Sequence, residues 1–411
     1  MNSLKKTFLA LILISIILVL SAANSVRAVG VTATISGISS PSGIAYDSGK
    51  NEIFILYPEI GEASVISASN YSLLANYFSV GVNANNLAYD SGKGEIFVTN
   101  SGQNSVAVIS DSTLAVVTTV TVGSYPFGVA YDSGKGEIFV ANYGNSSVSV
   151  ISDKTNSVVA TIPVGLPMGD QPPDLAYDSG KGEIFVANEN GDSVSVISDR
   201  TNKVVATVPV GYLPWGVVYD SGKGEIFVTN SYGGGLGTVS VISDNTNKVV
   251  ATVAVGANPR SIAYDSGKGE IYVANQDNGS VSVISDRTNN VVATIPVGPS
   301  YGPGSPSGMA YDSGKGEIFV ASSGDYPMVL VISDASSTSL SPSPTASAST
   351  SPTIPEFSCA ALILMLAAVF IVTLCAAVLT VKRRWKYAYF KLEKRKGSLM
   401  AWFVPRLESL F

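Results

Sequence analysis

The strongest constraint on the fold of this chain is a heptapeptide that occurs seven times with almost no change. Tyr-Asp-Ser-Gly-Lys-Gly-Glu appears six times, and one near copy has Asn51 in place of its second glycine. Successive copies are 42 to 47 residues apart, and they begin at Tyr46, Tyr89, Tyr131, Tyr177, Tyr219, Tyr264 and Tyr311. A period of about 40 to 50 residues with strand-like content is typical of a β-propeller with one blade per repeat.

The copies are built from four short segments rich in β-branched residues, separated by Gly, Asn, Asp and Ser, although the last copy has only the first three. In the third copy these segments predict strands at Phe127–Tyr131, Glu137–Ala141, Ser147–Ile151 and Ser157–Val164. The heptapeptide is therefore mostly the turn between the first and second strands of each blade.

The composition of that turn has a structural explanation. We expect Asp132 and Ser133 to hydrogen-bond to nearby backbone, Gly134 and Gly136 to adopt positive φ, and Lys135 to be solvated. A phosphate-binding loop is disfavoured because a glycine and a strand follow the lysine, where that loop needs Ser or Thr and a helix. A calcium loop is disfavoured because the lysine stands where a carboxylate ligand belongs.

The last copy lacks a fourth strand, since it ends at Val331–Asp334. A matching segment stands at the front instead, because Val31–Ile35 resembles Val158–Ile162 of the third copy. An N-terminal strand that completes the last blade would close the ring and remove its open edges. We therefore predict an all-β, seven-bladed propeller of four-stranded antiparallel blades with N-terminal strand closure over residues 29–334.

The two ends of the chain predict export and membrane attachment. Residues 1–28 have the pattern of a signal peptide, with an uncleaved anchor as the alternative. The uncharged stretch 359–381 is long enough for a transmembrane helix. The basic residues that follow it predict a cytoplasmic tail at 382–411, and the Ser/Thr/Pro-rich segment 335–358 predicts a stalk. The expected location is the cell surface, with the propeller outside.

Charge and rare residues narrow the choice of partners. The signal carries +3 and the tail +7, so a chain of net charge −6 leaves −16 for the part between them. Such an acidic domain is a poor partner for nucleic acid. The chain has no histidine, and both cysteines, Cys359 and Cys375, lie in the membrane segment. Nucleophile–histidine pairs and histidine-ligated metals are thereby excluded, and we expect no cofactor.

The repeats resemble the YVTN β-propeller family of cell-surface proteins, which is common in archaea. The matching pieces are Ile96–Asn100, Ile226–Asn230 and Ile271–Asn275, together with the Ser-Val-Ser-Val-Ile-Ser and Val-Val-Ala-Thr-Ile-Pro-Val-Gly segments. Near the C-terminus, Pro355–Phe357 with the apolar stretch and basic cluster resembles a PEF-type sorting signal of archaeal surface proteins, which implies cleavage and transfer to a lipid. The chain continues further past the basic cluster than those signals do, so permanent anchoring stays an equal alternative.

Strands that alternate in direction give the propeller two different faces. The turns between strands one and two, and three and four, share what we call the uniform face, where the copies are nearly identical. The remaining loops share the variable face, where they differ in length and composition. These loops are rich in residue types common in recognition surfaces. The candidate binding residues are Tyr125, Phe127, Tyr143, Met168, Tyr212, Trp215, Tyr232, Arg260 and Tyr301.

The predicted function is therefore recognition of an unknown protein or glycan at the cell surface, adhesion or envelope assembly. The plainer explanation of the variable face is that its loops are solvated and have no binding role. The alternative is an exported, metal- or carboxylate-dependent hydrolase or lyase, although no pair of carboxylates stands out in the sequence. Because the third strand runs toward the uniform face, the stalk should leave from that face. Three Asn-x-Ser sequons predict glycosylation, at Asn70, Asn145 and Asn278.

Overall fold

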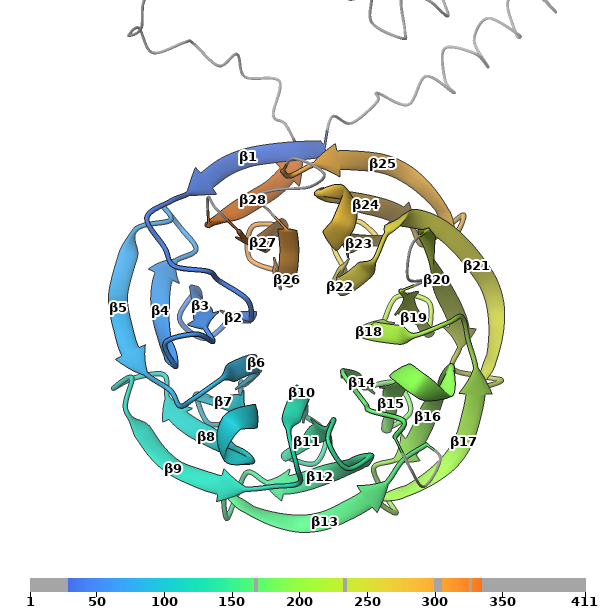
Figure 1. Cartoon of the computed structure of the whole chain (residues 1–411), viewed down its shortest axis with the longest axis horizontal. Helices are drawn as coiled ribbons and strands as arrows, with labels where there is room; N and C mark the ends of the chain where they lie inside the picture. The colour runs from blue at the N-terminus through green and yellow to red at the C-terminus, as the bar shows by residue number, and fades with distance from the viewer. Residues whose placement is uncertain (1–28, 166–168, 232–234, 299–304, 325–326, 335–411) are drawn as a thin grey trace, which may run out of the picture. The chain divides into compact units, whose positions relative to one another are not determined.

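The computed structural model describes residues 29–165, 169–231, 235–298, 305–324 and 327–334. They form seven four-stranded antiparallel sheets arranged as blades around a central axis (Figure 1). The predicted seven-bladed propeller is thus confirmed. The predicted signal, stalk, membrane helix and tail lie outside the described residues, and within them no helix is long and apolar enough to cross a membrane.

Blades 1 to 7 are numbered by the order of their heptapeptides, and strands run from the axis outward. Blade 1 contains β2 (Ile44–Asp47), β3 (Glu52–Tyr57), β4 (Glu62–Ser67) and β5 (Leu73–Ser79). Blade 2 contains β6 (Ala84–Asp90), β7 (Glu95–Asn100), β8 (Ser105–Ser110) and β9 (Val116–Thr121). Blade 3 contains β10 (Pro126–Asp132), β11 (Glu137–Asn142), β12 (Ser147–Ser152) and β13 (Ser157–Pro163). Blade 4 contains β14 (Leu175–Asp178), β15 (Glu183–Asn188), β16 (Ser193–Ser198) and β17 (Lys203–Pro209). Blade 5 contains β18 (Pro214–Asp220), β19 (Glu225–Asn230), β20 (Leu236–Ser243) and β21 (Lys248–Ala257). Blade 6 contains β22 (Pro259–Asp265), β23 (Glu270–Asn275), β24 (Ser280–Ser285) and β25 (Asn290–Pro296). Blade 7 contains β26 (Ser305–Asp312), β27 (Glu317–Ser323), β28 (Met328–Asp334) and, outermost, β1 (Val29–Ile35).

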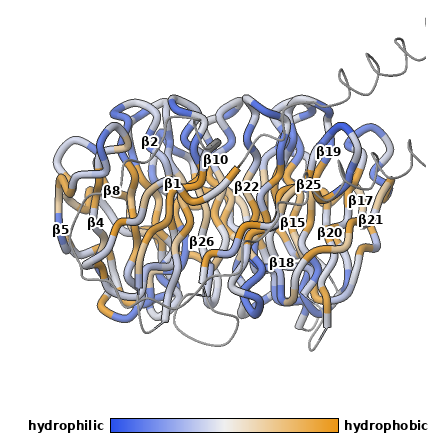
Figure 2. The backbone as a smooth tube through the Cα atoms, turned by 90° about the horizontal axis from the view of Figure 1, so that it is seen from above, coloured by the Kyte–Doolittle hydropathy of each residue, from blue (hydrophilic) through white to orange (hydrophobic). Residues whose placement is uncertain are grey.

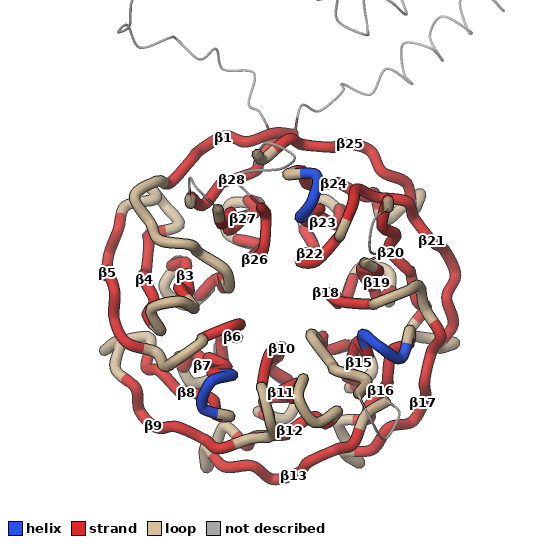
Figure 3. The backbone as a smooth tube through the Cα atoms, viewed as in Figure 1, coloured by secondary structure: helices blue, strands red, loops and turns tan. Residues whose placement is uncertain are grey.

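The four strands predicted in the third copy are confirmed, with ends that differ by one residue at most. Three of the loops between the second and third strands contain a 3-10 turn, which the sequence did not predict (Figure 3). These turns are η1 (Ser101–Gln103), η2 (Glu189–Gly191) and η3 (Gln276–Asn278).

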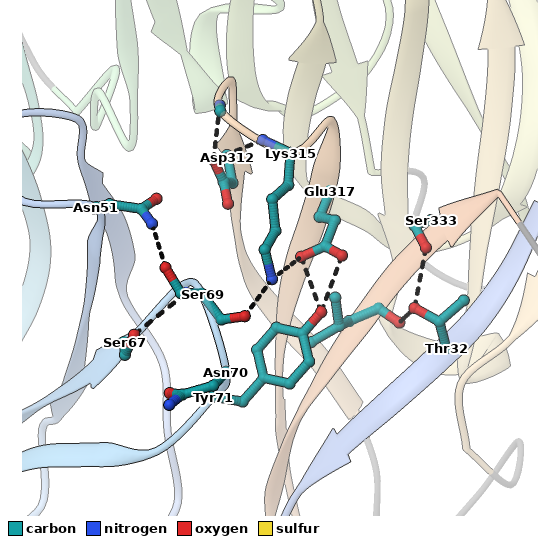
Figure 4. Close-up of polar contacts among 12 residues, drawn as sticks. Thr32, Asn51, Ser67, Ser69, Asn70, Tyr71, Asp312, Lys315, Glu317 and Ser333 are labelled. Atoms are coloured by element: carbon teal, nitrogen blue, oxygen red, sulfur yellow. Dashed lines mark hydrogen bonds and ion pairs between the residues drawn. The ribbon is translucent and has the colours of Figure 1, made fainter.

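The ring closes as the sequence predicts. β1 is the outermost strand of blade 7 and pairs antiparallel with β28, from Val29 opposite Asp334 to Ile35 opposite Val329. At the one irregularity in this pairing, the hydroxyl oxygens of Thr32 and Ser333 lie 3.0 Å apart (Figure 4). Since every strand of the seven sheets comes from Val29–Asp334, this segment is a complete closed ring.

The hydrophobic core lies between neighbouring blades. Each of its seven clusters draws residues from two adjacent sheets; one, for example, joins Phe139 and Val150 of blade 3 to Ile184 and Val186 of blade 4. Figure 2 shows apolar colour concentrated along the strands and hydrophilic colour concentrated at the turns on both rims. No blade can bury its faces alone, so the stability of each blade depends on its neighbours.

The repeated aspartate organises each turn on the uniform face. Asp132 is fully buried, and one carboxylate oxygen accepts the backbone N–H groups of Gly134 and Lys135, at 2.8 and 3.1 Å. Gly136 has φ +68, as predicted, and Asn51 takes the equivalent conformation in the first copy, with φ 59. The prediction for Gly134 is wrong, because its φ is not positive.

Gly134 is needed for a different reason. A Cβ atom there would stand 2.6 Å from the hydroxyl oxygen of Tyr177 in the next blade. The same close approach recurs around the ring, for example between Gly49 and Tyr89. The tyrosine that begins each heptapeptide thus packs on the turn of the preceding blade.

That tyrosine reaches the buried aspartate of the preceding blade. Burial, followed by the hydrogen bond to Asp47 and the charge of that aspartate, raises the pKa of Tyr89 to about 12. The pKa of Tyr219 is raised to about 12 by burial and by Asp178, and that of Tyr46 by burial and by Asp312 of blade 7. The contact therefore continues across the closing seam.

The repeated lysine is exposed at its turn in six of the seven copies, but it also joins blades, which the sequence did not predict. The Nζ atom of Lys135 donates to the backbone oxygen of Asp199, in the next blade's turn between strands three and four, at 2.5 Å. Five of the other six lysines reach the equivalent turn of the next blade, and these contacts are Lys50 to Asp111, Lys93 to Asp153, Lys181 to Asp244, Lys223 to Asp286 and Lys315 to Ser69.

Lys268 differs because blade 7 has no turn between its third and fourth strands, which come from opposite ends of the chain. Its Nζ atom bonds the backbone oxygen of Gly316 instead, at 3.2 Å. At the seam between blades 7 and 1, Lys315 reaches Ser69 and the hydroxyl of Tyr71 donates to Glu317 at 2.8 Å (Figure 4). The uniform face is therefore a continuous ring of contacts between blades.

The chain leaves the propeller on the uniform face, as predicted. In β28, Ile332 pairs with Ile318, close to the start of β27, which follows a heptapeptide turn. Asp334 lies two residues further toward that face. Val29 pairs with Asp334, so both ends of the ring emerge there.

Deletion of residues 29–37 should destabilise the ring severely, because it uncovers the edge of β28 and part of two core clusters. We expect aggregation, or a loss of at least about 5 kcal/mol, which lowers the Tm by roughly 10 °C or more. Thermal melting of segment 29–334 with and without these residues measures the effect. The control is a deletion of nine residues from 335 onward in the full chain, whose melting is compared with that of the intact full chain. An unchanged transition would show that β1 does not close the ring.

The ring should also lose stability at high pH. A tyrosine whose pKa is raised on folding stabilises the fold fully below its unfolded value near 10, and this contribution disappears as the pH rises toward 12. Melting curves of segment 29–334 between pH 8 and 12 should show this fall. Tyr89→Phe should cost about 1 kcal/mol at pH 8 and make the fall shallower. Tyr125→Phe, on the other face, is the comparison variant, and equal effects of the two variants would contradict the assignment.

Candidate functional site

A cavity of about 260 Å³ lies where the central axis meets the variable face. Each innermost strand begins at this face and ends in a heptapeptide turn on the opposite face. Residues at or just before the start of all seven strands line the cavity. We call it the mouth cavity.

One position of the repeat forms the ring of side chains around the mouth. It stands four residues before the repeated tyrosine, and its occupants are Ser42, Asn85, Phe127, Pro173, Trp215, Arg260 and Ser307, all of which line the cavity. The tyrosine itself is the same in every blade. The lining is therefore asymmetric, with large aromatic and basic groups on blades 3, 5 and 6 and small polar groups on blades 1, 2 and 7.

The aromatic groups form one connected cluster. The rings of Phe127 and Trp215 are 5.7 Å apart and nearly perpendicular, at 84°. Tyr143, from the loop after β11, lies 6.2 Å from Phe127 and 6.4 Å from Trp215, and Tyr125 lies 5.9 Å from Tyr143. The hydroxyl of Tyr143 donates to Glu189, the first residue of η2, at 2.7 Å. This contact fixes the cluster against blade 4.

Arg260 lies on the aromatic cluster. Its guanidinium carbon is 3.7 Å from the centre of the Trp215 ring, and Nε donates to the side-chain oxygen of Asn258 at 3.1 Å. Burial lowers the pKa of Arg260, while the negative charges of Glu189 and Asp277 oppose that shift. No carboxylate of the described residues is within ion-pair distance of Arg260. Its charge is therefore held in place by stacking and by longer-range attraction.

Asp174, the second ionisable group that lines the cavity, was not predicted from the sequence. Asp174 stands three residues before its repeated tyrosine, where four other blades have glycine. Its carboxylate accepts the N–H of Val217 in the next blade at 3.1 Å. Burial raises the pKa of Asp174 to about 7, although hydrogen bonds from Val217 and Leu175 oppose this. The carboxyl group therefore gains or loses its proton near neutral pH.

The predicted binding residues divide into three groups. Phe127, Trp215 and Arg260 line the mouth cavity, and Tyr125 and Tyr143 pack against this group. Tyr212 is 55% exposed and does not line the cavity. The remaining three, Met168, Tyr232 and Tyr301, lie outside the described residues. The structure thus brings five of the nine together, and their role in binding stays a prediction.

The three predicted glycosylation sites are exposed. Asn70 lies in a turn of the uniform face, whereas Asn145 lies in a loop of the variable face and Asn278 ends η3. Modification of these residues stays a prediction.

The acidic side chains near the cavity are few. Among the residues that the structure describes, no group of three or more His, Cys, Asp or Glu side chains is placed to hold one. Asp174 is the one carboxyl group in the lining, beside one cation, amides and hydroxyls. This set can bind polar and charged groups and can exchange one proton near neutral pH.

Comparison with known proteins shows the fold alone. Neither a family model nor a curated protein matches the chain, so membership of the YVTN family stays a prediction. Two similar solved structures are a Kuenenia stuttgartiensis hydrazine synthase and a streptogramin B lyase, each with a TM-score of 0.61. Their identities are 17% and 13%; the matches cover 71% and 73% of this chain, and 94% and 96% of the respective structures.

Asp174 should make the stability of the domain depend on pH. A carboxyl group whose pKa is raised on folding favours the folded state at low pH, and stability falls as the pH rises from about 4 toward 7. Thermal melts of segment 29–334 and its Asp174→Asn variant between pH 4 and 8 isolate this contribution. We expect the variant to be more stable than the wild type at pH 8 by a margin that shrinks at pH 5. A margin that is constant with pH would contradict the assignment.

Proposed function

We propose that this chain is a cell-surface recognition protein whose variable face binds a partner without catalysing a reaction. The observation that carries the proposal is the asymmetry of the mouth. Six of the seven heptapeptides are identical, yet the ring position four residues before the tyrosine has six different residue types in seven blades. Structural repetition alone gives no reason for such diversity, whereas recognition requires an irregular surface.

Exit of the chain on the uniform face supports this proposal. If the segment after Asp334 is a stalk that leads to a membrane helix, the uniform face points toward the membrane and the mouth points outward. The partner is a protein or a glycan of the envelope or of another cell, and permanent membrane anchoring and cleavage by a sorting enzyme both fit this arrangement. Protease treatment of intact cells tests the location, since an exposed propeller should be released or degraded.

An exported hydrolase or lyase is the alternative function. One observation favours it: Asp174 lies in a cavity with a pKa of about 7, which suits a general acid or base. The two similar structures carry the names of a synthase and a lyase, but identities below 20% bring neither activity to this chain. Assays of segment 29–334 against glycoside and ester substrates, with Asp174→Asn as the comparison, test this alternative.

Binding should depend on the mouth and not on the uniform face. Against protein and glycan arrays, we expect Trp215→Ala or Arg260→Ala in segment 29–334 to weaken binding to any captured partner by at least tenfold, and a central anchor costs about 2 kcal/mol or more. Tyr125→Ala should have a smaller effect, because that ring is 45% exposed at the edge of the cluster.

Lys135→Ala is the matched control, because it removes a contact between blades on the opposite face. It should lower stability by about 1 kcal/mol or less and leave affinity unchanged. Binding that is lost with Lys135→Ala but retained with both mouth variants would place the site on the uniform face and overturn the proposal.

A further inference from the structure

We propose that the mouth cavity binds a sugar acid, a single saccharide ring that carries a carboxylate, with Arg260 holding the carboxylate. This inference rests on the proposed function and names the chemical class that the same site accepts. Its parts are a guanidinium with unused donors, an aromatic wall, and polar groups on the facing wall.

The guanidinium group of Arg260 has capacity to spare. Of its five N–H donors, only Nε–H makes a hydrogen bond within the described residues, to Asn258. Stacking on Trp215 at 3.7 Å holds the planar group in one orientation. A fixed guanidinium with free terminal N–H groups matches the geometry of a carboxylate, which can accept two parallel hydrogen bonds. Because Arg260 is already partly desolvated, binding a carboxylate here costs less desolvation than it would at an exposed arginine.

The charge of the cavity favours a monoanion over other ligands. Cationic ligands are disfavoured because Arg260 already lies on the Trp215 ring. A phosphate dianion would meet a single cation and the carboxyl group of Asp174. An entirely apolar ligand would leave Arg260 and the amides without partners. One carboxylate balances one guanidinium.

Blades 1, 2 and 7 supply groups that suit hydroxyls. Ser42 lines the cavity, and its buried hydroxyl oxygen has no hydrogen-bond partner among the described residues. Within the described part of the chain, the side chain of Asn85 makes one hydrogen bond, a long one of 3.5 Å to the backbone oxygen of Pro126. Phe127 and Trp215 offer apolar surface to the carbon skeleton of a saccharide. A volume of about 260 Å³ is below the roughly 300–1,000 Å³ of drug-sized sites, which favours one ring over a longer buried chain.

Asp174 should make this binding depend on pH. It and Arg260 are the two ionisable side chains in the lining, and Glu189, Tyr143 and Asp277 interact electrostatically with Arg260. Ionised Asp174 repels the carboxylate of the ligand, whereas the protonated form can donate a hydrogen bond. Binding therefore strengthens as the pH falls from 8 to 6.

Trp215 provides a direct signal for the test. It is the one tryptophan of segment 29–334, since the other two stand at 385 and 402. We would titrate this segment with methyl glucuronide and methyl galacturonide while recording tryptophan fluorescence at pH 6 and pH 8. The matched neutral probes are methyl glucoside and methyl galactoside, and acetate tests the carboxylate alone.

We expect a saturable change with at least one uronide, and at least tenfold weaker binding of its neutral counterpart and of acetate. Arg260→Lys, which keeps the charge but loses the planar donor pair, should weaken uronide binding by at least tenfold. Asp174→Asn should bind equally well at pH 6 and pH 8, whereas the wild type binds several-fold more weakly at pH 8. Lys135→Ala should behave as the wild type, and thermal melts confirm that each variant is folded.

Equal affinity for charged and neutral probes, or no loss with folded Arg260→Lys, would overturn the assignment of the carboxylate to Arg260. No response to any uronide, with array binding that still depends on Trp215, would reject the sugar acid and leave the proposed recognition function intact. If array binding is unchanged in the Trp215 and Arg260 variants and no uronide gives a response, both the sugar acid and the proposed recognition function of the mouth are rejected.

Discussion

The architecture depends on the contact by which each blade holds the next one on the uniform face. A buried aspartate folds its own turn and receives the tyrosine of the following blade, while the lysine of the same turn bonds the following blade's backbone. Individually these contacts are modest, because the lysines are about one-third exposed. Repeated around a closed ring, they relate neighbouring blades in nearly the same way, with Lys268 as the one lysine that bonds a different turn. This explains why the heptapeptide tolerates so little change.

Concentration of these contacts on one face leaves the opposite face free to vary. The start of each innermost strand lies far from the turns that fix the blade, so different residues at the mouth do not disturb the ring. Phe127, Trp215 and Arg260 occupy equivalent positions in three blades, where the other blades have Ser, Asn or Pro. Function on a propeller is set by such positions and not by the fold, which this chain shares with enzymes of unrelated sequence.

The repeat made most of the fold predictable from the sequence. Its period predicted the blades, and the strand missing after Asp334 together with the spare segment at Val31–Ile35 predicted the closure. The role of Lys135 could not be predicted, because its partner Asp199 is 64 residues away and only the curvature of the ring brings them together.

The candidate site was predicted in part, because bulky residues that interrupt the repeat are visible when the seven copies are aligned with one another. Asp174 was also visible there, as an aspartate where four copies have glycine. Its significance depends on burial between two blades, which gives an ordinary carboxyl group a pKa of about 7. The bonding of Tyr143 to Glu189 likewise required the loops of two blades to be placed in space.

The pairing of β1 with β28 has a mechanical consequence. If a bound partner pulls on the mouth while the segment after Asp334 is tethered, the force enters the propeller at the end of β28. This strand lies between β1 and β27, and the pull runs along its length. Hydrogen bonds on both sides of β28 then resist sliding together, instead of breaking one after another from an end. A tether attached to an outermost strand, with a partner on only one side, would lack half of that resistance.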